Sequence, residues 1–218
     1  MLLADSIPKR HKDCTFDNFK VTEGTKDAFE FCKGWDGKDS IVLTGKTGTG
    51  KTHLAVATLK NMPRVALSSW EAECKKVQLE SYAEKYPDKD KYRIALDNGS
   101  WKTREPSCLF VPMVGLFIEL NEASRTDEGK KHLLDTYSLN YDCICFDDFG
   151  AEKLSEAKRE NIYYIIDTRY REMKSTIITS NFTIQEINEV EPRIASRFAE
   201  MGKIFQLNTK DYRKGGKQ

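Results

Sequence analysis

The feature that most constrains this sequence is the run from Gly45 to Thr52, which reads GKTGTGKT. It matches the pattern G-x-x-x-x-G-K-[ST] at every fixed position. A short, apolar, β-branched run precedes it at 40–44, and a helical pattern follows over 51–62 until Pro63 ends it. A strand, a glycine-rich turn and a helix in this order make a cradle for phosphate, because backbone N–H groups and the positive helix N-terminus point inward. The sequence therefore predicts a nucleotide site here.

Residue types within the run fit separate tasks. Gly45, Gly48 and Gly50 allow the positive φ angles that a tight phosphate-binding turn needs. Lys51 is expected to reach the β and γ phosphates, and Thr52 to place its hydroxyl on Mg²⁺, a cation that prefers oxygen ligands. The other residues expected to bind nucleotide around the loop are Lys46, Thr47, Thr49 and His53.

Length and charge exclude several classes of protein. A chain of 218 residues suits one sizeable domain that buries its core without disulfides. The net charge of +1 gives no overall attraction to nucleic acid or membrane, so any DNA-binding surface must be local. No apolar run is long enough for a membrane span or a signal peptide, and the six cysteines lack C-x-x-C spacing. We expect a soluble, cytoplasmic protein with reduced thiols.

Strand and helix patterns alternate along the chain. The expected strands cover 40–44, 107–112, 143–146, 176–181 and 203–207. Such alternation predicts an α/β protein with a parallel sheet, helices on both faces, and ligands at the carboxyl ends of the strands. A long helical pattern at 154–173 carries Arg169 and Arg171 near its C-terminal end, where cations are favourable.

The chain divides into segments of different character. We expect a lead-in at 1–23 that packs on the next domain, a main domain at 24–209, and a basic tail at 210–218. A heavily charged insertion with interleaved aromatic residues interrupts the main domain at about 64–106. Its basic and aromatic residues could stack bases, but its many acidic residues favour a solvated helical excursion over a DNA-contacting element.

Polar residues that follow the strands supply the rest of a phosphoryl-transfer site. Asp147 has the place and type of a Mg²⁺ carboxylate, and Asp148 is expected to polarise the attacking water. Asn181 ends the next strand and is placed to bond the same water or the γ-phosphate. Arg193 and Arg197 lie one helical turn apart, as a solvated ion-paired surface or as an arginine finger for a neighbouring subunit. We favour the finger for Arg197.

These motifs together resemble a known family. The segments that carry the resemblance are 45–55, 146–153, 177–181, 193–198 and 211–213, with a lead-in similar to the family's entry segment at 15–19. In this order they resemble the AAA+ ATPases of the DnaC-type helicase loader and IstB-like transposition helper family. The resemblance covers nearly the whole chain except the insertion at 64–106.

The resemblance implies a fold and a set of roles. The fold is a three-layer P-loop NTPase of the AAA+ class, with a five-stranded parallel sheet and little or no separate lid domain. The roles it implies are Walker A for Gly45 to Thr52, Walker B for Asp147 and Asp148, sensor 1 for Asn181, the arginine finger for Arg197, sensor 2 for Arg213, and a wall of the adenine pocket for Thr15 to Phe19.

The function implied is an ATPase that uses ATP and Mg²⁺ and acts on DNA in replication, most like a helicase loader. Its partners are then single-stranded DNA, a replicative helicase and further copies of itself, joined through the arginine finger. Asp148 stands where AAA+ proteins at large carry Glu, so we expect slow hydrolysis that depends on oligomerisation or DNA.

Three alternatives remain open at this point. One is a transposition helper that binds duplex DNA and regulates a transposase, and another is a nucleotide-gated binding module with negligible turnover. A P-loop kinase is less favoured because it leaves Asn181 and the segment at 193–198 unexplained. The chain also begins almost directly at the ATPase pattern, whereas loaders commonly carry a domain before it. We therefore expect another element, such as the insertion, to hold the partner, or a different client.

Overall fold

The computed structural model describes residues 3–150, 155–209 and 211–212. The chain forms two compact units. The larger unit combines the chain before Pro63 with the chain after Pro106, and the smaller unit is the stretch Pro63–Pro106 between them.

The larger unit is built on a five-stranded parallel sheet with the strand order β4-β5-β6-β1-β7. Its strands are β1 (Ser40–Thr44), β4 (Cys108–Pro112), β5 (Cys143–Phe149), β6 (Ser175–Ser180) and β7 (Gly202–Gln206). The first strand in sequence therefore lies inside the sheet, between β6 and β7. Because the strands are parallel, the chain leaves β1, β5 and β6 at one edge of the sheet, where a ligand site is expected.

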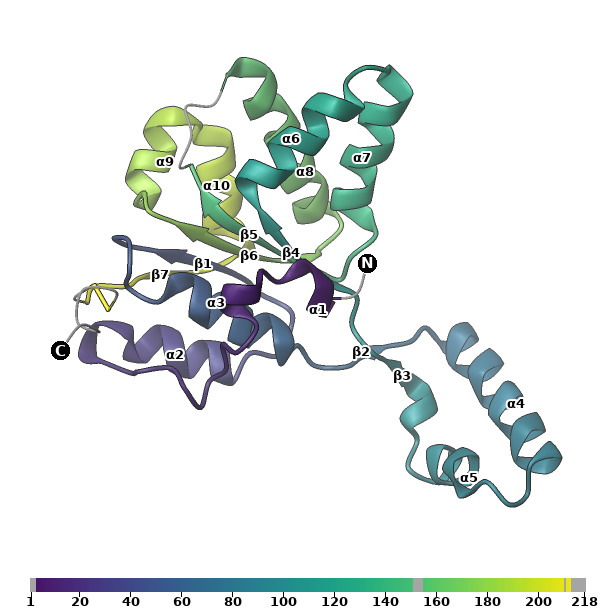
Figure 1. Ribbon diagram of the computed structural model, residues 1–218. Coiled ribbons are helices and arrows are strands. Elements are labelled where there is room, and N and C mark those ends of the chain that lie inside the picture. Colours follow the sequence, from purple (N-terminus) through teal and green to yellow (C-terminus); the bar gives the residue numbers. More distant parts are fainter. Residues whose placement is uncertain (1–2, 151–154, 210, 213–218) are drawn as a thin grey trace. The chain divides into compact units, whose positions relative to one another are not determined.

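Helices cover both faces of this sheet, as Figure 1 shows. One face carries α1 (Leu3–Ser6), α2 (Lys26–Lys33) and α3 (Lys51–Lys60). The other carries α6 (Met113–Ala123), α7 (Asp127–Leu139), α8 (Glu156–Arg171), α9 (Ile184–Val190) and α10 (Pro192–Met201). The predicted three-layer fold with five parallel strands is confirmed.

The apolar strand runs explain the two cores. Every residue of β1 is buried, and alternate side chains leave a strand on opposite faces. Ile41 and Leu43 join a core with Leu54 of α3, while Val42 joins the opposite core with Phe198 of α10. A strand buried on both faces is apolar throughout rather than alternating, which is why these runs are recognisable in the sequence.

The N-terminal lead-in is part of the core on the α3 face. Ile7 and Phe19 are buried in the same cluster as Leu54. Ser6 accepts a hydrogen bond at its Oγ from the backbone N–H of Phe110 in β4, at 3.1 Å. Two short 3₁₀ turns, Lys9–His11 and Glu23–Thr25, shape the segment. The lead-in is thereby fixed against the sheet on the side where α3 begins.

The smaller unit is a helical excursion closed by a short strand pair. It contains β2 (Val65–Ala66), α4 (Ser69–Lys85), α5 (Asp90–Asp97), a 3₁₀ turn and β3 (Thr103–Arg104), with β2 and β3 antiparallel. Within this fully described stretch Ala72 is the one buried hydrophobic residue. The helices of this unit therefore bury little apolar surface. Across the described ranges, no helix has the length and apolar character needed to cross a lipid bilayer.

Candidate active site

The glycine-rich loop leaves the buried strand β1 and leads into α3. Gly45, Gly48 and Gly50 have φ angles of 138°, 81° and 94°, a region that side chains disfavour. A Cβ at Gly45 would lie 2.3 Å from the carbonyl oxygen of Leu207, so the loop also approaches its neighbour too closely for any side chain. The positive φ expected at these three positions is confirmed.

The ammonium of Lys51 lies inside this loop. Its Nζ donates hydrogen bonds to the carbonyl oxygens of Gly45 at 2.8 Å and Lys46 at 3.0 Å, and to Oδ1 of Asn181 at 2.9 Å. Thr49 supports the turn by donating from its Oγ1 to the carbonyl of Lys46 at 2.9 Å. Lys51 is buried although it is charged, so its cation is held at a fixed place between the loop and the end of β6.

A hydroxyl and a carboxylate meet beside the lysine. Thr52 donates from its Oγ1 to Oδ1 of Asp147 at 2.9 Å, and Thr179 of β6 donates to the same oxygen at 2.7 Å. Burial raises the pKa of Asp147, the two hydroxyl hydrogen bonds oppose that rise, and the nearby charge of Asp148 adds to it. A bound cation stabilises the ionised form of a buried carboxylate that lies next to another acid. The hydroxyl oxygen of Thr52 and the carboxylate oxygen of Asp147 are also the kinds of ligand that Mg²⁺ prefers.

Asp148 and Asn181 lie at the ends of neighbouring strands. Asp148 has a φ of 59° at an irregular end of the β5–β6 pairing, and its backbone N–H donates to Oγ1 of Thr179 at 3.0 Å. The left-handed turn separates the two acidic side chains, because Asp147 is buried whereas Asp148 is exposed and lines a cavity. Asn181 lines the same cavity beside Lys51. Thr179 was not predicted as a site residue, although its hydroxyl donates to the carboxylate of Asp147 and accepts from the backbone N–H of Asp148.

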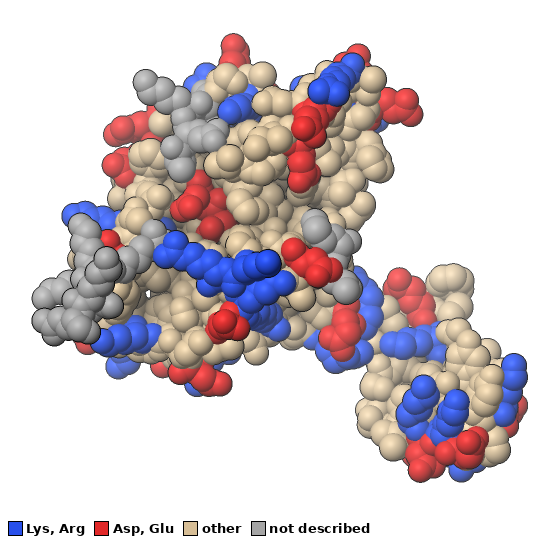
Figure 2. Space-filling model, in the orientation of Figure 1, with Lys and Arg blue, Asp and Glu red and all other residues tan. Residues whose placement is uncertain are grey.

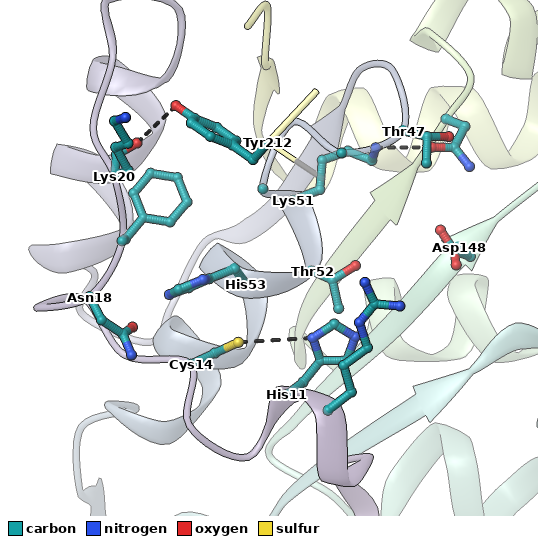
Figure 3. A pocket seen from close by; sticks show the side chains of 15 residues that line it. His11, Cys14, Asn18, Lys20, Thr47, Lys51, Thr52, His53, Asp148 and Tyr212 are labelled. Carbon is teal, nitrogen blue, oxygen red and sulfur yellow. Dashed lines mark hydrogen bonds between the residues drawn. The ribbon is translucent and has the colours of Figure 1, made fainter. Parts of the chain in front are cut away.

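The cavity has a volume of about 440 Å³, within the range of small-ligand pockets. Figure 3 shows Lys20 and Tyr212 at one end of it and His11, Thr52 and Asp148 at the other. The predicted site residues that line it are Phe19, Thr47, Gly48, Gly50, Lys51, Thr52, His53, Asp148 and Asn181. Asp148 is the one acidic residue among the described lining residues, against three lysines and arginines. Such a lining suits a polyanion.

Aromatic side chains form the wall away from Lys51. Phe19 stacks on Phe29 with a centroid distance of 5.6 Å and meets the edge of the His53 ring at 5.2 Å. His53 donates from Nε2 to the carbonyl of Thr15 at 2.8 Å, which fixes the proton on that nitrogen. A flat apolar wall at this end fits a heterocyclic base, and it comes from the lead-in and from α3 together.

Several lining residues were not predicted as site residues. They are Arg10, His11, Cys14, Lys20 and Tyr212, whereas Asn18, which also lines the cavity, belongs to the segment 15–19 expected at the adenine pocket. Tyr212 bridges two parts of the site, since its N–H donates to the carbonyl of Gly48 and its hydroxyl donates to the carbonyl of Lys20, both at 3.1 Å. In the sequence, the basic run at 9–12 and the Asp-Tyr-Arg segment at 211–213 could have pointed to some of these residues. Only the packing of the folded chain, however, brings Arg10, His11 and Tyr212 to the loop.

Arg197 and Arg193, the two arginines considered for an arginine finger, do not line the cavity. Arg197 is on α10, where its Nε donates to Oδ1 of Asp167 at 2.8 Å and its guanidinium lies 4.8 Å from the ring centre of Tyr170. Its neighbour Arg193 pairs with Glu191 at 2.8 Å. The structure therefore does not bring Arg197 to the cavity of its own chain. Arg213 and residues 151–153 of the segment 146–153, which contains the predicted Walker B pair, lie outside the described residues.

Known proteins resemble this chain in sequence. The replicative helicase loader DnaC of Escherichia coli strain K12 is 22% identical over 186 residues, which are 83% of this chain and 60% of DnaC. An uncharacterized protein, YqaM of Bacillus subtilis, is 22% identical over 216 residues, covering 92% of this chain and 56% of YqaM. The chain thus spans about 60% or less of the length of these relatives.

Solved structures resemble it in fold. A crystal structure of the DnaC helicase loader has a TM-score of 0.62 and 25% identity, and the match covers 92% of this chain and all of that one. DnaA from Aquifex aeolicus bound to AMPPCP has a TM-score of 0.64 and 21% identity over 95% of this chain and 53% of DnaA. Together with the sheet described above, these likenesses confirm the AAA+ P-loop fold.

A family match settles the wider relationship. The model of the family described as IstB-like ATP binding protein matches residues 91–214, more than half of the chain. The matched span contains Asp147, Asp148, Asn181 and Arg197, while the glycine-rich loop precedes it. The chain therefore belongs to the family of IstB-like ATP binding proteins.

Proposed function

We propose that this chain is an ATP-binding and ATP-hydrolysing AAA+ factor that acts on DNA in replication, as a helicase loader. One observation carries the nucleotide part: a cavity of about 440 Å³ joins the glycine-rich loop, Lys51, Thr52, Asp148 and Asn181 to an aromatic wall. Phosphate-binding donors at one end and a flat apolar surface at the other fit a nucleoside triphosphate. The replication part is supported by the likeness to DnaC.

Each residue around the loop has a task in this proposal. The backbone N–H groups of the loop hold the phosphates, and Lys51 exchanges its carbonyl partners for β- and γ-phosphate oxygens. Thr52 and Asp147 would hold Mg²⁺, which supplies charge neutralisation to the phosphates when it is bound. Phe19 offers the adenine ring a surface to stack against.

Asp148 and Asn181 face the end of the cavity where a water would attack. The exposed carboxylate of Asp148 polarises that water, and the Asn181 side chain orients it beside the γ-phosphate. In our proposal Arg197 comes to this end from a second copy of the chain. Since its side chain is 26% exposed on α10 and bonded to Asp167, it must leave that carboxylate to act as a finger. Such a site is incomplete in a single chain.

The proposed partners are single-stranded DNA and a replicative helicase. A DnaA structure of the same fold was solved with AMPPCP and single-stranded DNA, with a TM-score of 0.63 and 21% identity over 93% of this chain and 51% of DnaA. The similarity to DnaC, a replicative helicase loader, favours the helicase as client. In this proposal 24–209 is the ATPase domain, with the unit at Pro63–Pro106 inserted in it.

The family match also favours a second candidate function. Because the chain belongs to the IstB-like family and resembles its transposition helpers, the alternative is a helper that binds duplex DNA and a transposase. A pull-down from host extract with the intact protein and ATP separates the two. Retention of a ring helicase supports the loader, and retention of a transposase replaces it with the helper.

The main test is nucleotide-dependent DNA binding. We expect fluorescence anisotropy of a labelled single-stranded oligonucleotide to show tighter binding when Mg²⁺ and ATP are present. Lys51→Ala should abolish the effect of ATP, because it removes the cation that the γ-phosphate requires. Lys38→Ala is the matched control, since Lys38 is a surface lysine with an 83% exposed side chain. If the unaltered protein binds no single-stranded DNA with ATP, the replication proposal is wrong.

A further inference from the structure

The N-terminal strap, which we define as residues 6–20, is held in place along its length. Ser6 is bonded to β4, and Ile7 is 2% exposed. Lys60 of α3 donates from Nζ to the carbonyl of Cys14 at 3.1 Å, and His53 donates to the carbonyl of Thr15 at 2.8 Å. The strap is therefore anchored to the helix that begins with Lys51 and Thr52, and the residues between its anchors have a fixed position.

Arg10 and His11 stand between these anchors, on the 3₁₀ turn Lys9–His11, and both line the cavity. Figure 3 shows His11 below Thr52 in the view and away from Lys20 and Tyr212, with its Nδ1 3.9 Å from Sγ of Cys14. Figure 2 shows a band of Lys and Arg side chains across the larger unit, where Figure 1 draws this segment. The strap thus places Arg10 and His11 on one part of the cavity wall, whereas Lys20, its last residue, lines the opposite end.

Arg10 lines the same cavity as Thr52 and Asp148. In the proposed mode of binding, the loop N–H groups at the start of α3 hold the inner phosphates, and the terminal phosphate lies toward Thr52 and Asp148. A guanidinium forms two parallel bonds with phosphate oxygens, so an arginine at the outer end interacts most with the terminal phosphate. ADP lacks that phosphate and leaves the guanidinium in solvent.

We propose that Arg10 is a specificity-determining residue that contacts the γ-phosphate of ATP from within the same chain, so that the strap distinguishes ATP from ADP. His11 closes the same end of the cavity beside it. This inference rests on the proposed function of the cavity and deepens it, because it makes the strap a reporter of which nucleotide is bound. A partner that binds the strap would then distinguish the ATP-bound from the ADP-bound chain.

The test compares the affinities for AMPPNP and ADP, each with Mg²⁺, by isothermal titration calorimetry. Arg10→Ala should weaken AMPPNP binding by about 10-fold or more and ADP binding by no more than about 2-fold. Lys9→Ala is the matched control, because Lys9 is exposed on the same turn and does not line the cavity. It should change both affinities by less than about 2-fold.

A second substitution keeps the test decisive if Arg10→Ala does not fold. Arg10→Gln keeps much of the side-chain length without the charge, and it must lose the preference for AMPPNP as Arg10→Ala does. If either variant is folded and keeps the ratio of the two affinities found in the unaltered protein, the inference is wrong while the proposed function stands. If the unaltered protein binds neither nucleotide, the proposed function fails and the inference fails with it.

Discussion

Arg169 of α8 offers a stability prediction that the structure makes in detail. Its side chain is fully buried, and its guanidinium donates to Oγ1 of Thr176 at 2.9 Å and to the carbonyl of Ser175 at 2.6 Å. Four longer bonds of 3.3 to 3.4 Å reach carbonyls at the end of α7 and before β5, those of Tyr137, Ser138, Tyr141 and Asp142. One side chain thus donates to carbonyls at the C-terminus of α7 and joins that helix end to β6 and to the residues before β5.

The magnitude follows from these bonds. Burial lowers the pKa of Arg169 to about 10, so the side chain stays charged at neutral pH. A hydrogen bond from a charged donor contributes about 1.5 to 3 kcal/mol, and the two short bonds alone give about 3 to 6 kcal/mol. Relief of the buried charge offsets part of this. We therefore expect Arg169→Ala to lower the free energy of unfolding by about 3 to 5 kcal/mol, an exceptional loss for one substitution.

The assay must report on the larger unit alone. Tryptophan occurs at positions 35, 70 and 101, and only Trp35 belongs to the larger unit, where it is buried. Urea unfolding followed by fluorescence in a background with Trp70→Phe and Trp101→Phe measures that unit. The matched control is Arg171→Ala, two residues along the same helix, with a 65% exposed side chain that pairs with Asp167.

This control should lose no more than about 1 kcal/mol, because exposed ion pairs contribute little. A loss below about 1 kcal/mol in Arg169→Ala, or equal losses in the two variants, would refute the role given to the buried guanidinium.

Three further predictions concern the loop, the pH dependence and the shared site. Gly50→Ala should cost about 1 to 2 kcal/mol in urea unfolding, because φ is 94° and a Cβ would lie 2.9 Å from the Phe19 ring; an unchanged midpoint would contradict it. Burial favours a higher pKa for Asp167, but the bonds from Arg197 and the nearby arginine charges lower it below the ordinary 3.8. The stability that Asp167 contributes is thus present above about pH 4 and is lost as the pH falls through its folded pKa, so Asp167→Asn and the unaltered protein should converge in acid; a constant difference in urea midpoints would contradict this. Asp148→Asn and Arg197→Ala should each be inactive as ATPases, and mixing them should restore turnover if the finger acts between chains; a mixture as inactive as its components would exclude that.

The strands and the loop were predictable because their signals are local. A strand buried on both faces must be apolar at nearly every position, as in Ser40–Thr44, and a phosphate-binding turn needs glycine where φ is positive. The fold class follows from the alternation of such strands with helices. The end of β5 was less predictable, since the irregular pairing that extends it to Phe149 depends on contacts with β6.

Residues whose position depends on packing between distant segments were not predictable. Arg169 and Arg171 both read as cations near a helix end, yet residues two apart on a helix point to opposite sides, so one is buried and the other exposed. Arg10 and Tyr212 reach the cavity only because the lead-in and the chain after β7 cross the loop. Nothing in the local sequence around either residue encodes that crossing.

Calorimetric titration of ATP with Mg²⁺ measures whether the cavity beside the glycine-rich loop binds the nucleotide. We expect one nucleotide to bind per chain in the unaltered protein. Lys51→Ala should bind roughly 10- to 100-fold more weakly, because the cation now held by Gly45, Lys46 and Asn181 is the one that meets the outer phosphates. If the unaltered protein binds no ATP, or if Lys51→Ala binds it with equal affinity, the cavity is not the ATP site proposed here.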